Sequence, residues 1–198
     1  MPNPLDRLDP ERRATLVRAA ADEFASAGLE GASLNRIIRA CGMSKSSFYH
    51  LFESKQDLVD LVIGDLTEQV RAGLDVPAPD SFAENFWEGV EGFLARLERD
   101  LVAHPDALLL GRLFYAAPPQ GAQAGVVAEI SGWVARVLQV GREAGAVRAD
   151  LPPELQLHLV MAVLRAMDEW AVRALAHGSS ATPRVSLVVD ACRRLLAL

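Results

Sequence analysis

Lysine is scarce in this chain of 198 residues, which has 20 basic and 26 acidic side chains but lysine only at Lys45 and Lys55. The net charge of −6 argues at first against nucleic-acid binding, because affinity for DNA depends largely on Lys and Arg neutralising phosphates. The average hides a local excess, however. Residues 33–55 hold four basic side chains and one acid, so this segment carries +3 and the rest of the chain −9.

Long apolar runs are also missing. The most apolar segment, residues 155–171, is interrupted by a histidine, an arginine and two acids, and it falls short of the roughly 20 apolar residues that a bilayer span needs. The first residues, MPNPLDRLDPERR, carry charges and prolines where a signal peptide would need an apolar stretch. We therefore expect no membrane span, no secretion and a cytoplasmic location.

Cysteine and histidine are too few and too scattered for a metal site. Cys41 and Cys192 lie far apart, and they form no metal-ligand cluster with the four scattered histidines. This usage fits a reducing compartment, and we expect neither a metal nor a cofactor.

Recognisable catalytic constellations are absent as well. An enzyme would need a nucleophile with a positioned base, paired carboxylates or a metal cluster. Asp168 and Glu169 are adjacent and so point to different faces of a helix, and no glycine-rich phosphate loop occurs. We predict that the protein is not an enzyme.

Alternating strand patterns with Asn-Gly or Asp-Gly turns do not occur, whereas helical periodicity recurs throughout. With 51% hydrophobic and 23% charged residues the chain is typical of a folded protein. The fold class is therefore predicted as all-α, with about nine helices. Their expected ranges are 9–28, 33–41, 44–50, 54–73, 81–104, 106–117, 120–144, 153–177 and 183–196.

Capping residues and glycines set these boundaries. Ser54 with Asp57, and Ser81 with Glu84, each fit a capping box that opens a helix. The turn formers of residues 75–79 mark the best candidate boundary between domains. We expect a DNA-binding domain over residues 1–73 and a ligand-binding and dimerisation domain over residues 74–198.

The second and third predicted helices form the sequence pattern of a helix-turn-helix. They are short, a tight turn with Gly42 joins them, and basic residues gather beside the second. A glycine at positive φ lets the chain turn sharply, so the helix after Ser44 can place its first residues in a major groove.

Residues 12–66 resemble the DNA-binding domain of the tetracycline-repressor (TetR) family. The resemblance rests on A-x-x-x-F-x-x-x-G followed by S-L-N-R-I-I-R-A-C-G-M-S-K-S-S-F-Y-H-L-F-E-S-K-Q-D-L, with Phe48-Tyr49, Phe52 and Lys55 at the family spacing. Cys41 and Ser46 depart from the family pattern, which usually has another small residue and glycine there. Neither departure threatens the fold, but Ser46 could alter base preference.

Chemistry and this resemblance together assign roles on double-stranded DNA. The hydroxyls of Ser33, Ser44 and Tyr49 would bind backbone phosphates, and Lys55 would be a phosphate clamp. Lys45 and its neighbours on the reading helix would reach base edges and nearby phosphates. Phe48 and Phe52 would pack inside. The predicted DNA-binding residues are Ser33, Ser44, Lys45, Ser46, Ser47, Tyr49, His50 and Lys55.

The resemblance implies a homodimer formed by the last two helices, and both are rich in apolar residues. It also implies a pocket for a small-molecule effector. Aromatic residues at helical spacing are more often plain core, but as a set they suggest an apolar or aromatic ligand. Tyr115, His158 and Asp168 are alternative polar partners for it. The predicted ligand-binding residues are Phe86, Trp87, Phe114, Tyr115, Trp133, Met161 and Trp170.

The function implied is a transcriptional repressor that binds a palindromic operator and is released by its ligand. Three alternatives stay open at this point: a transcriptional activator, a helical ligand-binding dimer without sequence-specific DNA binding, and a redox sensor that uses Cys41.

Overall fold

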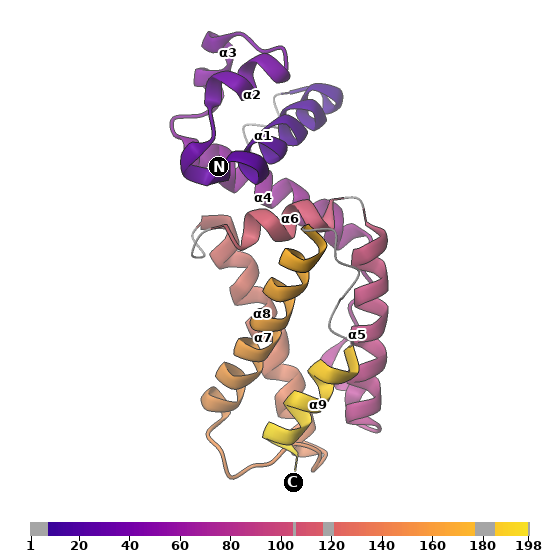
Figure 1. Ribbon diagram of the computed structural model, residues 1–198. Helices are drawn as coiled ribbons and strands as arrows, with labels where there is room; N and C mark the ends of the chain where they lie inside the picture. Colours follow the sequence, from indigo (N-terminus) through magenta and orange to yellow (C-terminus); the bar gives the residue numbers. More distant parts are fainter. Residues whose placement is uncertain (1–7, 105, 117–120, 177–184, 198) are drawn as a thin grey trace. The chain divides into compact units, whose positions relative to one another are not determined.

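The computed structural model describes residues 8–104, 106–116, 121–176 and 185–197, and over these residues the chain is helical without strands. This confirms the all-α prediction (Figure 1). The α-helices are α1 (Pro10–Gly31), α2 (Leu34–Ala40), α3 (Lys45–Leu51), α4 (Lys55–Ala72), α5 (Phe86–Ala103), α6 (Ala107–Phe114), α7 (Gly121–Glu143), α8 (Pro153–Ala176) and α9 (Val185–Leu196), and η2 (Pro79–Phe82) is a 3-10 helix.

The helices form two compact units. The first, called the N-terminal unit, comprises residues 1–72 with 105–124, and the second, the C-terminal unit, comprises residues 73–104 with 125–198. Helix α6 therefore belongs to the N-terminal unit, where it packs against α1 and α4, although it follows α5 in the chain. The division into functional domains at residues 73 and 74 stays a prediction.

In the N-terminal unit, α1 packs against α2, α4 and α6 around one apolar core. Leu16, Phe24, Ile37 and Phe48 are at most 1% exposed there, so each helix contributes one apolar face. These packed faces give α2 and α3 a rigid support.

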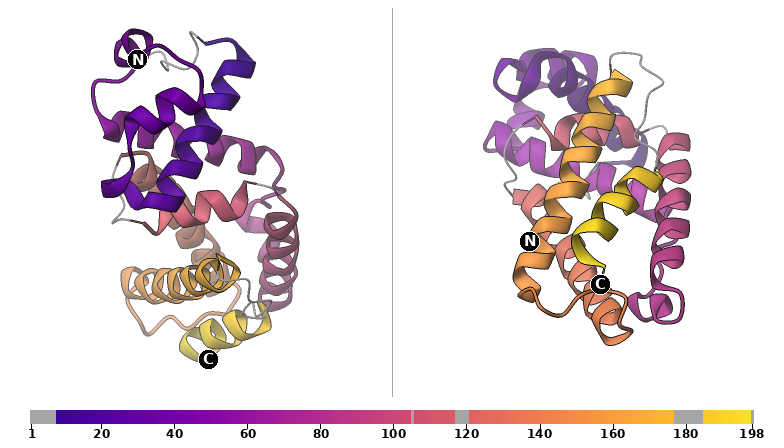
Figure 2. Two further views of the ribbon diagram at one scale, coloured as in Figure 1. Left: turned by 45° about the horizontal axis from the view of Figure 1, so that its top comes forward. Right: turned by 60° about the horizontal axis from the view of Figure 1, so that its bottom comes forward.

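In the C-terminal unit, α9 packs against both α5 and α8, as the two views of Figure 2 show. Its core is aromatic: the indole ring of Trp133 lies edge-on to Phe82 and tilted against Phe93. The buried Gln156 side chain accepts a hydrogen bond from Arg142 and donates one to the carbonyl of Arg148, so it joins the start of α8 to the end of α7 and the following loop.

Local capping signals predicted several boundaries correctly. Ser54 and Asp57 form the reciprocal capping box at the start of α4, with N–H to oxygen distances of 2.9 and 3.1 Å. Gly28, at φ 72°, interrupts α1 where a stop was predicted, although the helix resumes as far as Gly31.

One boundary prediction is wrong. The helix expected over residues 81–104 begins at Phe86, and residues 79–82 form η2 instead. The Ser81 hydroxyl donates to the carbonyl of Ala78 at 2.7 Å within that turn, so Ser81 is not the N-cap of α5 and makes no capping box with Glu84. The predicted helix ends at residues 117, 120, 177 and 183 lie outside the described residues.

Candidate nucleic-acid interface

Helices α2 and α3 are joined by the tight turn that the sequence predicts. Gly42 has φ +67°, a left-handed conformation that glycine adopts without strain. The Met43 N–H donates to the carbonyl of Ile38 at 3.1 Å and closes the end of α2. Ser44 then caps α3, because its hydroxyl oxygen accepts the Ser47 N–H at 3.0 Å. Two short helices thus meet at a fixed angle, as in a helix-turn-helix.

Helix α3 is held by one buried ring. Phe48 is fully buried and packs against the rings of Tyr49 and Phe52, with centroids 5.6 and 4.9 Å away. Tyr49 itself is 54% exposed. The other predicted DNA-binding residues on this helix are also exposed: Lys45, Ser46, Ser47 and His50. Helix α3 is therefore anchored on one side and offers polar and basic groups on the other.

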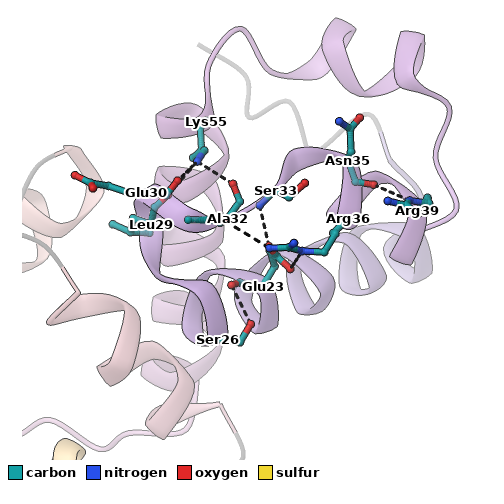
Figure 3. A network of polar contacts seen from close by, with 11 residues as sticks. Glu23, Ser26, Leu29, Glu30, Ala32, Ser33, Asn35, Arg36, Arg39 and Lys55 are labelled. Carbon is teal, nitrogen blue, oxygen red and sulfur yellow. Dashed lines mark hydrogen bonds and ion pairs between the residues drawn. The ribbon is translucent and has the colours of Figure 1, made fainter.

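Ser33 does not use its side chain as a cap. Its N–H donates to the Glu23 carboxylate at 2.8 Å, so a carboxylate from α1 satisfies the first donor of α2. The same carboxylate accepts bonds from the Arg36 Nε at 2.9 Å and from a terminal nitrogen at 2.6 Å. Figure 3 shows this cluster, in which Glu23 ties α2 to α1.

The cluster depends on a charged carboxylate. Hydrogen bonds from Arg36, and then from the Ser33 N–H, lower the pKa of Glu23, and the same pairing raises the pKa of Arg36. Because the pKa of Glu23 is lowered in the folded state, its stabilising effect is present above the ordinary glutamate range. It is lost as the pH falls through the lowered value.

Lys55 makes contacts that were not predicted from the sequence. Its ammonium group donates to the carbonyls of Leu29, Glu30 and Ala32 at 3.1, 3.0 and 2.9 Å, as Figure 3 shows. An ammonium group has three N–H donors, and each has an acceptor here. Lys55 thus binds the carbonyl end of α1, including its C-cap residue Ala32. Its role as a phosphate clamp stays a prediction.

Replacing Lys55 by methionine is expected to lower the free energy of unfolding by about 2 kcal/mol, because charge-assisted bonds to partly buried carbonyls are lost. The chain offers a matched control in its other lysine, since Lys45 is exposed. Thermal melts of Lys55→Met and Lys45→Met should differ by several degrees. Equal melting temperatures would contradict the structural role of Lys55.

The predicted ligand-binding residues do not all come together. Phe86 is buried in the core cluster of the C-terminal unit, and Trp87, Trp133 and Met161 are partly buried and pack against that cluster. The Trp87 Nε1 donates to the carbonyl of Ala146 at 3.1 Å, and the Trp133 Nε1 donates to that of Pro77 at 3.0 Å. Both indoles therefore have structural partners already.

The other three predicted ligand residues lie elsewhere. Phe114 and Tyr115 stand at the end of α6 in the N-terminal unit, with ring centroids 5.7 Å apart, and Trp170 is 49% exposed on α8. Hollows of about 260 and 630 Å³ lie on the N-terminal unit, and none of the seven residues lines either of them. The ligand-binding assignment stays a prediction.

A metal site is not expected from the scattered cysteines and histidines. The described ranges hold no group of three His, Cys, Asp or Glu side chains that could bind a metal ion. Cys41 donates weakly to the carbonyl of Ile38 at 3.5 Å, and burial raises the pKa of Cys192. No helix among these residues is long and apolar enough to cross a membrane.

Known proteins share both the sequence pattern and the fold. The sequence profile described as "Bacterial regulatory proteins, tetR family" matches residues 16–62. The HTH-type transcriptional repressor SCO4008 of Streptomyces coelicolor is 31% identical over 171 residues, 83% of this chain and 80% of that protein. The uncharacterised HTH-type regulator YdgC of Bacillus subtilis is 36% identical over 61 residues, 31% of each chain.

Solved structures agree on the fold. A TetR family transcriptional regulator from Chloroflexus aurantiacus has a TM-score of 0.68 and 19% identity, over 98% of this chain and 97% of that one. SmeT, the repressor of the Stenotrophomonas maltophilia multidrug efflux pump SmeDEF, has a TM-score of 0.67 and 11% identity, over 93% and 90%. The exposed helix α3, its buried Phe48 anchor and these likenesses lead to one conclusion: the chain belongs to the TetR family of transcriptional regulators and carries the DNA-binding domain of that family.

Proposed function

We propose that this regulator is a repressor that binds a palindromic operator as a homodimer and leaves it when a small apolar or aromatic molecule binds the domain of residues 74–198. DNA binding is supported by the amphipathic arrangement of helix α3. Phe48 is buried on one side of the helix, and Lys45 and Tyr49 are exposed. A helix anchored in this way can enter a major groove without losing its packing.

Repression is supported by two similar proteins that are themselves repressors. SCO4008 is named a transcriptional repressor, and SmeT is the repressor of a multidrug efflux pump. A ligand would release the operator by binding more tightly to a conformation with misplaced reading helices, and such coupling is typically about 1–3 kcal/mol.

A homodimer is supported by apolar side chains exposed on the last two helices. Leu155 and Trp170 of α8 are 45% and 49% exposed, and Leu187 and Leu195 of α9 are 55% and 37% exposed. Helices α8 and α9 pack against each other, so these side chains belong to neighbouring elements of one unit. An interface between subunits along these two helices would remove the exposed apolar side chains from water.

Trp170→Glu is therefore expected to raise the dimer dissociation constant by about 30-fold or more, because a tryptophan that is buried in an interface can contribute about 2 kcal/mol or more. Val102→Glu is the matched control: Val102 is 65% exposed, but it lies on α5. Sedimentation equilibrium of both variants measures the effect. If Trp170→Glu and Val102→Glu dimerise alike, this interface is excluded.

A reporter assay tests repression itself. A promoter fragment that the protein binds is placed before a reporter gene, with and without the regulator. Repression predicts lower reporter expression with the protein present, and recovery when an apolar or aromatic effector is added. Higher expression with the protein present would identify an activator instead.

A further inference from the structure

The four cations of residues 33–55 fall into two classes. Arg36 is paired with the Glu23 carboxylate, and Lys55 donates to three backbone carbonyls. Arg39 and Lys45 are exposed, and no carboxylate contacts either of them in the part of the chain that the structure describes. In this structure Arg36 and Lys55 thus have partners within the fold, whereas Arg39 and Lys45 are available for another partner.

The Arg39 side chain is exposed on α2 and has no contact with the Glu23 carboxylate. Arg36 and Ala40 line a hollow together with α1 residues, whereas Asn35 and Arg39, four residues apart, are exposed and do not line it. Figure 3 shows Arg36 directed at Glu23 and Arg39 directed away from it. The Arg39 Nε reaches the carbonyl of Asn35 at 3.4 Å, which lays the side chain along the helix and leaves its terminal nitrogens for a partner.

Arg39 lies near the end of α2, just before the turn that leads to the reading helix α3. Only residues 40–44 separate it from Lys45 at the start of α3. The chain outside residues 33–55 carries −9, so a polyanion must be attracted by local positive charge. A guanidinium group presents two parallel donors that match the oxygens of a phosphate.

We propose that Arg39 binds a backbone phosphate of the duplex and adds a second cationic contact beside Lys45, while Arg36 holds α2 against α1 and makes no phosphate contact. This assignment rests on the DNA-binding function of the domain. It concerns positioning on the duplex and not base reading, because phosphates carry no sequence information.

The test measures the salt dependence of binding to a 30-base-pair duplex of random sequence by fluorescence anisotropy. Arg39→Gln is compared with Arg36→Gln, the same substitution three residues away on the same helix. Each lost phosphate contact reduces the slope of log K against log salt by about 0.9, so a dimer with two copies should lose about 2. Arg39→Gln should show this reduction, and both Arg36→Gln and the charge-preserving Arg39→Lys should keep the wild-type slope.

Three outcomes would overturn the proposal. A wild-type slope for Arg39→Gln alongside a reduced slope for Lys45→Gln would exclude Arg39 while leaving DNA binding intact. A reduced slope accompanied by a melting temperature well below that of the wild type would make Arg39 a structural residue. Wild-type protein without any salt dependence would remove both the phosphate contact and the DNA-binding function on which it rests.

Discussion

Asp65→Ala is expected to lower the free energy of unfolding by about 3 kcal/mol. The Asp65 carboxylate of α4 is buried, with a side chain 6% exposed, and it accepts a hydrogen bond from the Arg13 Nε of α1 at 2.7 Å. Breaking a buried ion pair from one side typically costs about 3–5 kcal/mol. We take the lower end because the Arg13 side chain is 34% exposed and stays partly hydrated.

Denaturant unfolding measures this effect, with Glu68→Ala as the control on the same helix. Glu68 is exposed and its nearest contact with Arg71 is 3.6 Å, so its loss should change stability by less than about 0.5 kcal/mol. Asp65→Asn keeps an acceptor and should fall between the two. Equal unfolding midpoints for Asp65→Ala and Glu68→Ala would show that the α1–α4 pair contributes nothing.

The double variant Lys45→Ala, Tyr49→Ala is expected to weaken operator binding by about 100-fold or more. Each side chain would supply a bond to a phosphate or base, and bonds to charged groups contribute about 1.5–3 kcal/mol each. Both side chains are exposed and Phe48 keeps its buried place, so the fold should survive.

The matched control removes an exposed cation and an exposed apolar side chain from another helix. Arg99→Ala with Val102→Ala on α5 does this. Gel-shift titrations of both double variants against the same fragment measure the difference. A loss of affinity in the control as large as that in the α3 variant would contradict the assignment of α3 as the reading helix.

Much of the DNA-binding domain could be predicted because its signals are local. The Ser54–Asp57 box, the Ser44 cap and the Gly42 turn each depend on residues no more than a few positions apart. The Ser81–Glu84 pattern is equally local, but the capping box predicted from it was wrong. Ser81 lies in the 3-10 helix η2, where its hydroxyl donates to the carbonyl of Ala78. A pattern of this kind cannot tell a 3-10 turn from the start of a helix.

The contacts that organise the site could not be predicted because they span long stretches of chain. Glu23 reaches Ser33 and Arg36 across 10 and 13 positions, and Lys55 reaches carbonyls 23 to 26 positions away. The sequence does hold one signal that Lys55 has a partner outside α4. A cation in the first turn of α4 opposes the helix dipole, whereas a cation at the carbonyl end of α1 is favoured by that helix. The position therefore indicates a partner outside its own helix.

The predicted effector pocket depends on side-chain packing, which periodicity does not reveal. Phe86 is buried in the core of the C-terminal unit and Trp133 packs against that core, and their role as ligand contacts stays a prediction. Aromatic residues at helical spacing serve either purpose, so the sequence could not separate a core ring from a ligand contact.

Sequence-specific binding of duplex DNA is the central claim, and one titration tests it most directly. Purified protein is titrated against the DNA upstream of its own gene and against a scrambled fragment of equal length, each at 50 and 200 mM salt. We predict a tighter complex with the upstream fragment, protection of a palindromic site, and a steep loss of affinity with salt on both fragments. Equal and salt-insensitive binding to the two fragments would contradict it.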